Sequence, residues 1–147
     1  MNKKIPQECE CSCETCVNMC KERPCWGTPA EVRRMIENGF ADKLMLDWYY
    51  YKKGNVYIIA PAIVGCEKKS SPFWPSGRCA LLDDSNKCIL HGTDMKPSEA
   101  KWASCTDIND KIDIHLLVAN TWKNKEAREL VKEWKDRVGY YYERPKV

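Results

Sequence analysis

The chain has 147 residues, ten of which are cysteine, and a formal net charge of +3 at pH 7. A chain of this length can bury a core of its own, so ten cysteines exceed what stability alone requires. Acidic and basic residues are interleaved and leave no concentrated positive field for a polyanion, so nucleic acid is not indicated as a partner.

The N-terminal residues "MNKKIPQECE" lack the apolar stretch of a secretory signal. No window approaches the roughly 18 apolar residues that span a bilayer. We therefore expect a cytoplasmic protein with no membrane association. In a reducing cytosol, cysteine-rich patterns indicate metal binding or catalysis more often than disulfides. A disulfide framework stays open as an alternative, because a secreted chain without its signal peptide has the same appearance.

We expect residues 1–12 to be flexible, since chain termini are poorly ordered unless they are tied down. The first predicted element is a helix in "WGTPAEVRRMIENGF". Thr28 suits the N-cap and Pro29 the first helical position. Glu31 completes a capping box, and Gly39 supplies a left-handed stop. The apolar residues that share the predicted buried face are Val32, Met35 and Ile36.

The next two segments are predicted to differ in type. "ADKLMLDWYYYKKG" is consistent with a short helix that turns Leu44, Met45 and Trp48 inward. "NVYIIAPAIVGC" is expected to form a β-segment that Pro61 ends, since Val, Ile and Tyr favour strands.

The chain between Ser70 and Ser98 is rich in Pro, Gly, Ser, Asp and Asn, and it has cysteines where an ordinary domain has apolar anchors. We expect such a segment to need stabilising contacts from outside the segment. A helix capped by Thr106 is predicted after it, with apolar residues at helical spacing: Ile108, Ile112, Leu116 and Ala119. The last predicted helix covers residues 121–138 and stops at Gly139. Its apolar stripe consists of Ala127, Leu130, Val131, Trp134 and Val138.

These elements predict a mainly α fold with irregular loops and a minor β-segment. No repeat, linker or low-complexity tract divides the sequence, so we expect residues 1–147 to form one small domain organised around a cysteine-ligated metal site. The cysteines fall into two groups, Cys9 to Cys25 and Cys66 to Cys105, with forty residues between them.

Cys13 and Cys16 form a CxxC pair, the commonest half-site for zinc and iron, because thiolates at this spacing can turn toward one point. Cys20 and Cys25 follow closely. The distal donors that complete the predicted site are Cys79, Cys88, His91 and Cys105. Ligation across the groups is favoured, because loop closure costs only logarithmically more as the loop lengthens. A structural metal contributes on the order of 10 kcal/mol to folding.

Some assignments stay open at this point. Cys9 and Cys11 lie outside the main pattern and either complete a second site or are dispensable thiols. Cys66, beside Gly65 and a charged run, is either a ligand or a free thiol. His91 has an alternative role, because a histidine in a polar loop often serves a local hydrogen bond.

The sequence resembles the YkgJ-like cysteine-cluster family, described as a zinc- or iron-chelating domain. The resemblance rests on "CETCVNMC", "RPCWGTPAEVRRMIENGF" and "GRCALLDDSNKCILHGTDMKPSEAKWASC", and it covers roughly residues 13–105. The family's first motif is CxxCxxCC. The residues that fit it are Cys13, Cys16 and Cys20, with Met19 in place of its third cysteine. The residues that fit the second motif are Cys79, Cys88, Lys96, Pro97 and Cys105.

The resemblance implies metal chelation, with Cys25 as a candidate to supply the ligand that Met19 cannot. We therefore expect an intracellular metal-binding protein that chelates zinc or an iron or iron-sulfur centre, in a structural or accessory role with a protein partner. Some larger relatives, of the flagellin lysine N-methylase type, couple a similar cluster to methyl transfer.

The alternative is a metal-dependent redox or protein-modifying, methylase-like enzyme, for which His91 and Glu99 are the candidate acid/base helpers near the distal cysteines. A third interpretation treats the tryptophans, the tyrosine-rich C-terminus and the lysines as a nucleic-acid surface around zinc. Most tryptophans lie in an apolar periodicity, which assigns them to the core instead.

Overall fold

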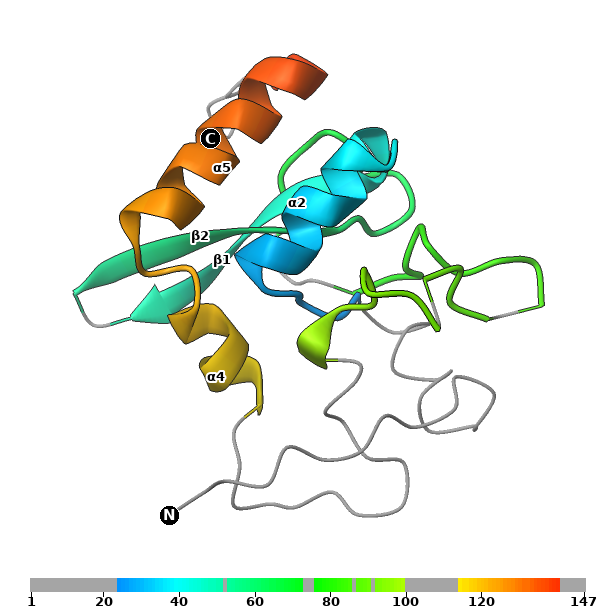
Figure 1. The fold of residues 1–147 in the computed structure, drawn as a ribbon, viewed down its shortest axis with the longest axis horizontal. Coiled ribbons are helices and arrows are strands. Elements are labelled where there is room, and N and C mark those ends of the chain that lie inside the picture. The colour runs from blue at the N-terminus through cyan, green and yellow to red at the C-terminus, as the bar shows by residue number, and fades with distance from the viewer. Residues whose placement is uncertain are drawn as a thin grey trace.

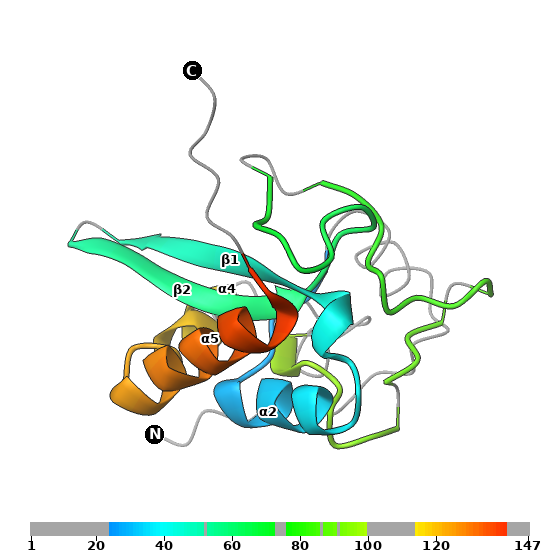
Figure 2. The same ribbon diagram turned by 90° about the horizontal axis from the view of Figure 1, so that it is seen from above.

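The computed structural model describes residues 24–51, 53–72, 76–85, 87–90, 92–99 and 114–140. In chain order, the named elements are α2 (Pro29–Glu37), the 3-10 turn η1 (Ala41–Lys43), β1 (Leu44–Tyr51), β2 (Gly54–Pro61), α4 (Ile114–Asn120) and α5 (Lys125–Val138). The two strands form a long hairpin, and α2 and α5 lie together on one side of it (Figures 1 and 2). Within the described part of the chain, no helix has both the length and the apolar character to cross a membrane.

The first helix, α2, begins and ends as the sequence predicts. The Glu31 N–H donates to Thr28 Oγ1 at 3.3 Å, and the Thr28 N–H donates to Glu31 Oε1 at 2.9 Å, which completes the capping box. At the other end, Gly39 has φ 92°. Its N–H bonds the Ile36 carbonyl, and the Phe40 N–H bonds the Met35 carbonyl. This pair of bonds is a Schellman stop, so the capping prediction is confirmed.

The predicted helix in "ADKLMLDWYYYKKG" is wrong, because Leu44–Tyr51 forms strand β1 and only Ala41–Lys43 is helical. β1 pairs antiparallel with β2, from Leu44 opposite Pro61 to Tyr51 opposite Gly54. The predicted β-segment and its end at Pro61 are confirmed. Aromatic residues favour strands, and each strand satisfies the backbone groups of the other. The partner that decides the conformation of β1 therefore lies outside the segment itself.

The prediction of a mainly α fold is also wrong. Among the described residues, the named α-helices have 9, 7 and 14 residues, and beside them stand two strands of 8 residues each. The described residues are organised around an apolar core and not around a metal site. Among them, no group of three or more His, Cys, Asp or Glu side chains is arranged to hold a metal ion.

The last helix, α5, starts at Lys125, four residues later than predicted, and Asn124 is its N-cap. The Ala127 N–H donates to Asn124 Oδ1 at 2.8 Å. Gly139, in the left-handed conformation with φ 69°, ends the helix as expected. The stripe residues that are buried are Ala127, Leu130, Val131 and Trp134, and Val138 packs against them. This stripe covers the hairpin, which confirms its assignment to the core.

Two indole groups join the helices to the rest of the core. Trp134 Nε1 donates to the Ala41 carbonyl at 2.9 Å, and Trp122 Nε1 donates to the Gly27 carbonyl at the same distance. Both side chains are almost completely buried. Burial of the ring stabilises the fold while the polar N–H stays satisfied. The assignment of these tryptophans to the core is therefore confirmed.

The helix predicted from Thr106 is described only in its last part, α4, and residues 106–113 lie outside the described residues. Leu116 and Ala119, two of its predicted apolar positions, fall within α4, and Ala119 is fully buried.

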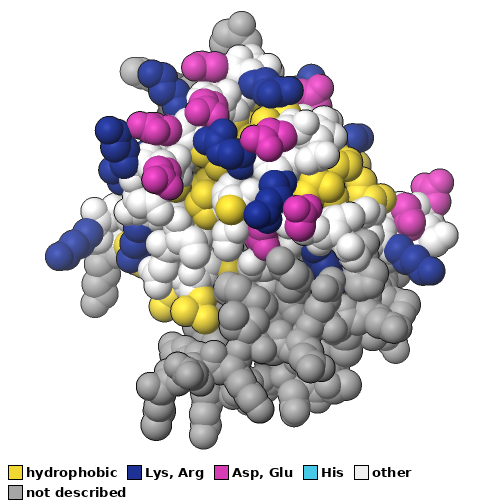
Figure 3. Space-filling model, in the orientation of Figure 1, with side chains coloured by type: hydrophobic (Ala, Val, Ile, Leu, Met, Phe, Trp, Pro, Cys, Tyr) yellow, Lys and Arg dark blue, Asp and Glu magenta, His cyan; other side chains and the backbone are white. Residues whose placement is uncertain are grey.

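The outer surface of α2 and α5 carries Lys and Arg side chains intermixed with Asp and Glu (Figure 3). One exposed pair, Arg33 and Glu133, joins the two helices at 3.1 Å. This face agrees with the interleaved charge of the sequence.

The described residues between 62 and 99, here called the loop segment, contain no named helix or strand. Its start lies along the outer edge of β1, where the Leu46 N–H donates to the Lys69 carbonyl and the Ser71 N–H donates to the Leu46 carbonyl. Isolated bridges pair Ile63 with Cys79 and Leu82 with Cys88. The loop segment is thus attached to the scaffold by scattered bonds, as the prediction of an irregular, cysteine-bearing region anticipated.

Candidate functional site

Cys79 and Cys88 lie at the two ends of a short loop. Between them, the Asp83 N–H donates to the Lys87 carbonyl at 2.8 Å, and Asp83 Oδ1 accepts the backbone N–H of Lys87 at 2.9 Å. Cys79 is only 5% exposed, whereas Cys88 is half-buried, and both pack against the main core. Cys79 and Cys88 are nine positions apart in the sequence. The loop therefore holds these two predicted ligands on neighbouring arms of one turn.

Cys25, the third described ligand candidate, precedes α2 and is 4% exposed. The next residue, Trp26, is joined to Glu99 in both directions. The Glu99 N–H donates to the Trp26 carbonyl at 3.0 Å, and the Trp26 N–H donates to Glu99 Oε1 at 3.4 Å. These two bonds, here called the Trp26–Glu99 link, hold the end of the first cysteine group against the chain that leads to Cys105.

Glu31 strengthens this junction from the first turn of α2. Beyond its capping role, its carboxylate accepts the Ser98 N–H at 2.9 Å and the Ser98 hydroxyl at 2.8 Å. Both residues are buried, at 4% and 3% exposure. A buried carboxylate requires such donors, because an unsatisfied charge in the interior costs several kcal/mol.

A histidine that the sequence analysis did not single out completes a side-chain cluster at the same junction. His115 of α4 stacks on the Trp26 indole, with ring centroids 3.6 Å apart and an interplanar angle of 24°. Its Nδ1 contacts Glu99 Oε2 at 2.5 Å. On the other edge of the indole, Trp26 Nε1 donates to Asp47 Oδ2 at 2.9 Å. We call His115, Glu99, Trp26 and Asp47 the histidine cluster.

The histidine cluster orients a titratable ring. Glu99 is 4% exposed, while the His115 side chain is 30% exposed. A carboxylate at Nδ1 fixes the tautomer, so that Nε2 becomes the acceptor atom, suited to a proton or a metal ion. The stacked indole fixes the plane of the ring. The arrangement can therefore position an imidazole for acid–base chemistry or ligation.

Glu99 was predicted as an acid/base helper beside His91, but the residue that it contacts in the structure is His115. His91 lies outside the described residues. The only sequence signal for His115 is that it is one of two histidines, and its place in the apolar run "IHLLVAN" conceals a polar role.

Cys66 differs from the three ligand candidates. It packs beside a separate small apolar cluster of Met45, Ala62 and Ile63 and carries a free thiol. Burial, reinforced by the negative charge of Glu67, raises the pKa of the Cys66 thiol above its ordinary value of 9.0, and Lys69 offsets part of this.

Of the eight predicted ligands, the structure describes Cys25, Cys79 and Cys88, and it does not bring these three into one metal-binding group. The predicted ligands that lie outside the described residues are Cys13, Cys16, Cys20, His91 and Cys105. Cys9 and Cys11 also lie outside them. The motif residues Lys96 and Pro97 are both buried.

Comparison of the chain with family models, curated proteins and solved structures finds no match. The resemblance to the YkgJ-like family therefore stays a prediction.

Proposed function

We propose that this chain is a cytoplasmic metal-binding protein whose clustered cysteines chelate zinc or an iron or iron-sulfur centre, in a structural or accessory role with a protein partner. The ligand set proposed is the one predicted from the sequence: Cys13, Cys16, Cys20, Cys25, Cys79, Cys88, His91 and Cys105. The observation that carries the proposal is the Trp26–Glu99 link, which joins the residue after Cys25 to a residue six positions before Cys105.

The link limits how far apart the two groups can lie. Cys20 is five residues before Cys25, and Cys105 is six residues after Glu99. An extended chain covers at most about 3.6 Å per residue, so Cys105 lies within about 22 Å of the link. The end of the first group and the last cysteine of the second group are therefore tethered to one junction of the scaffold.

The donors fit a closed, cysteine-rich centre. Cys25 and Cys79 are 4% and 5% exposed, and structural zinc sites and iron-sulfur clusters both use thiolates shielded from water. When bound, the metal would neutralise thiolates that are otherwise costly to bury. Cys66, which packs beside the separate cluster of Met45, Ala62 and Ile63, is left outside the proposed ligand set.

The loop segment supplies a reason for such a centre. It has no named helix or strand, so its backbone groups need partners outside regular secondary structure. A metal held by Cys79 and Cys88 would attach the middle of this segment to the N-terminal group.

The test is metal analysis of the full chain, purified without oxygen, combined with an optical spectrum. We expect at least one tightly held metal or cluster per chain; brown colour that bleaches with dithionite identifies iron-sulfur, and a colourless zinc-containing protein identifies zinc. The double variant C79S/C88S should lose the metal. The matched control C66S should keep the full metal content, because its thiol lies outside the proposed ligand set.

A wild-type chain that is fully folded, contains no metal and has only free thiols would contradict the proposal. Equal metal loss in C66S and C79S/C88S would contradict the ligand assignment.

A further inference from the structure

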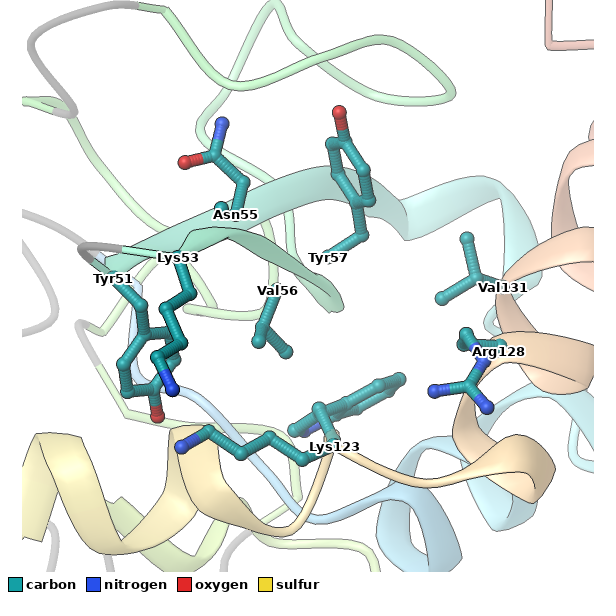
Figure 4. A pocket seen from close by; sticks show the side chains of 10 residues that line it. Tyr51, Lys53, Asn55, Val56, Tyr57, Lys123, Arg128 and Val131 are labelled. Atoms are coloured by element: carbon teal, nitrogen blue, oxygen red, sulfur yellow. The ribbon is translucent and has the colours of Figure 1, made fainter.

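A groove lies between the tip of the hairpin and the turn that joins α4 to α5. Its volume is about 660 Å³. Val56, Trp122 and Val131 give it an apolar floor. Tyr57 follows Val56 in β2, and its side chain points to the other side of the strand, away from Val56 (Figure 4). Small-molecule sites typically have volumes of about 300–1,000 Å³ and combine apolar walls with a few polar groups.

Three cationic side chains converge on this groove from three different elements. Lys53 belongs to the hairpin turn, Lys123 to the turn between the helices, and Arg128 to α5. The amino groups of both lysines point to one side of the groove, beside Tyr51, and the guanidinium of Arg128 enters from the opposite wall (Figure 4). None of the described residues that line the groove is acidic.

The position of Lys123 is fixed by its neighbours. Its Nζ lies 3.8 Å from the centroid of the Tyr51 ring, and the Tyr51 hydroxyl donates to Asn120 Oδ1 at 2.8 Å. Among the residues that the structure describes, no acidic side chain forms an ion pair with any of the three cations. Like charges brought to one cavity repel one another, and an anion between them removes that cost.

The balanced charge of the whole sequence conceals this local excess. The interleaved charges cover the outer face of α2 and α5, whereas the groove concentrates positive charge over an apolar floor. Lysines bind phosphate as point charges, and arginine offers a planar fork for a second anionic or carbonyl oxygen.

We propose that the groove binds a nucleotide, with its phosphate between Lys53 and Lys123 and its planar base over the apolar floor toward Arg128. The chemistry recognised is a phosphate ester joined to a planar ring. Its source is either a free nucleotide or one unit of a single strand. This site is independent of the proposed metal centre.

The test is calorimetric titration of the full, metal-containing chain with adenosine monophosphate, adenosine and inorganic phosphate. Adenosine monophosphate should bind at least about tenfold more tightly than either adenosine or phosphate alone, since only it meets both the cations and the floor. Higher salt should weaken its binding.

The variant K53Q/K123Q should weaken nucleotide binding by about tenfold or more, and R128Q by a smaller factor. The matched control is K125Q, because Lys125 is an exposed cation of α5 that pairs with Glu129 at 3.9 Å and does not line the groove. This control should bind like the wild type. Circular dichroism should be identical for all variants, since the substituted groups are polar side chains at the surface.

Short oligothymidylate and oligoglutamate distinguish the sources. Tighter binding of the strand than of the nucleotide, lost in K53Q/K123Q, assigns the phosphate to a single strand; equal binding assigns it to a free nucleotide. Binding of oligoglutamate in preference to both would overturn the proposal in favour of an acidic peptide. Absence of nucleotide binding, or equal binding by wild type and K53Q/K123Q, would overturn it as well.

Discussion

The scaffold and the loop segment share one apolar core but differ in how their backbones are held. The scaffold, made of α2, the β1–β2 hairpin and α5, buries apolar side chains and pairs its own backbone groups. The loop segment has no named helix or strand. It places Leu81 and Leu90 in the same core, and it is also tied down by isolated bridges and by buried polar residues such as Ser98 and Glu99. Apolar packing is shared over many contacts, whereas each polar attachment is specific and hard to replace.

This difference indicates how each region should respond to the loss of a side chain. Loss of one apolar side chain weakens the scaffold as a whole, while loss of one attachment should release the loop segment and leave the helices formed. The junction around Trp26, where both regions meet, should respond to either kind of change.

Removal of the proposed metal should give the largest difference in stability between the loop segment and the scaffold. Treatment with a strong chelator should lower the hydrogen-exchange protection of loop-segment amides, such as Val64 and Ala80, by at least about a thousandfold, equivalent to about 4 kcal/mol. The α5 amides should lose less than about tenfold. Equal loss in both regions would show that they form one cooperative unit, and unchanged protection would argue against a structural metal.

Truncation of a scaffold residue should destabilise the whole protein. W134A removes a fully buried indole and should lower the free energy of unfolding by about 3–5 kcal/mol in urea titrations. The matched variant W134F keeps most of the ring but leaves the Ala41 carbonyl without its donor, and it should cost about 1–3 kcal/mol. A loss below about 1 kcal/mol for W134A would show that the core is not what holds the scaffold.

Substitution of Glu31 should show how much its hydrogen bonds with Ser98 contribute to the free energy of unfolding. E31A leaves the buried donors of Ser98 and Thr28 without an acceptor and should cost about 3 kcal/mol. T28A removes only the cap of α2 and should cost about 1 kcal/mol. The excess in E31A should appear as faster exchange at Ser98 and Glu99. If the two variants have equal effects, Glu31 acts as a cap alone.

The sequence predicts the parts of the molecule whose determinants are local. The start and stop of α2 depend on residues within one short segment, and they form as expected. β1 was assigned wrongly because Leu44, Met45 and Trp48 fit the spacing of a helix as well as that of a strand. The deciding contact is with β2, and a pattern within one segment does not contain it.

The candidate site shows the same limit. Asp83 and the turn residues around it made an irregular, cysteine-bearing loop predictable. The contact between Glu99 and His115 joins residues 16 positions apart in the sequence, and no spacing rule connects them. The second role of Glu31, as an acceptor for Ser98, depends on a residue 67 positions away. Side-chain partners brought together by tertiary packing leave no periodic signal in the sequence.

The smallest expected effect concerns Cys66, which lies where the loop segment leaves the scaffold. Because burial and Glu67 raise the pKa of its thiol, its alkylation rate, followed by peptide mass spectrometry, should rise with pH to a midpoint above 9.0. In the folded protein the thiol keeps its proton at a pH where the unfolded chain loses it. Its contribution to stability is therefore complete below pH 9.0 and is lost as the pH rises through the folded pKa.

E67Q should lower the alkylation midpoint only in part, because burial is the larger cause of the shift. Chelator treatment should leave the rate at Cys66 almost unchanged while it exposes Cys79 and Cys88, since Cys66 is tied to Met45, Ala62 and Ile63 by packing and not by a metal. If chelation makes Cys66 reactive at neutral pH, then Cys66 is a ligand. The proposed centre would then extend to the edge of β1, and the boundary between the two regions would move with it.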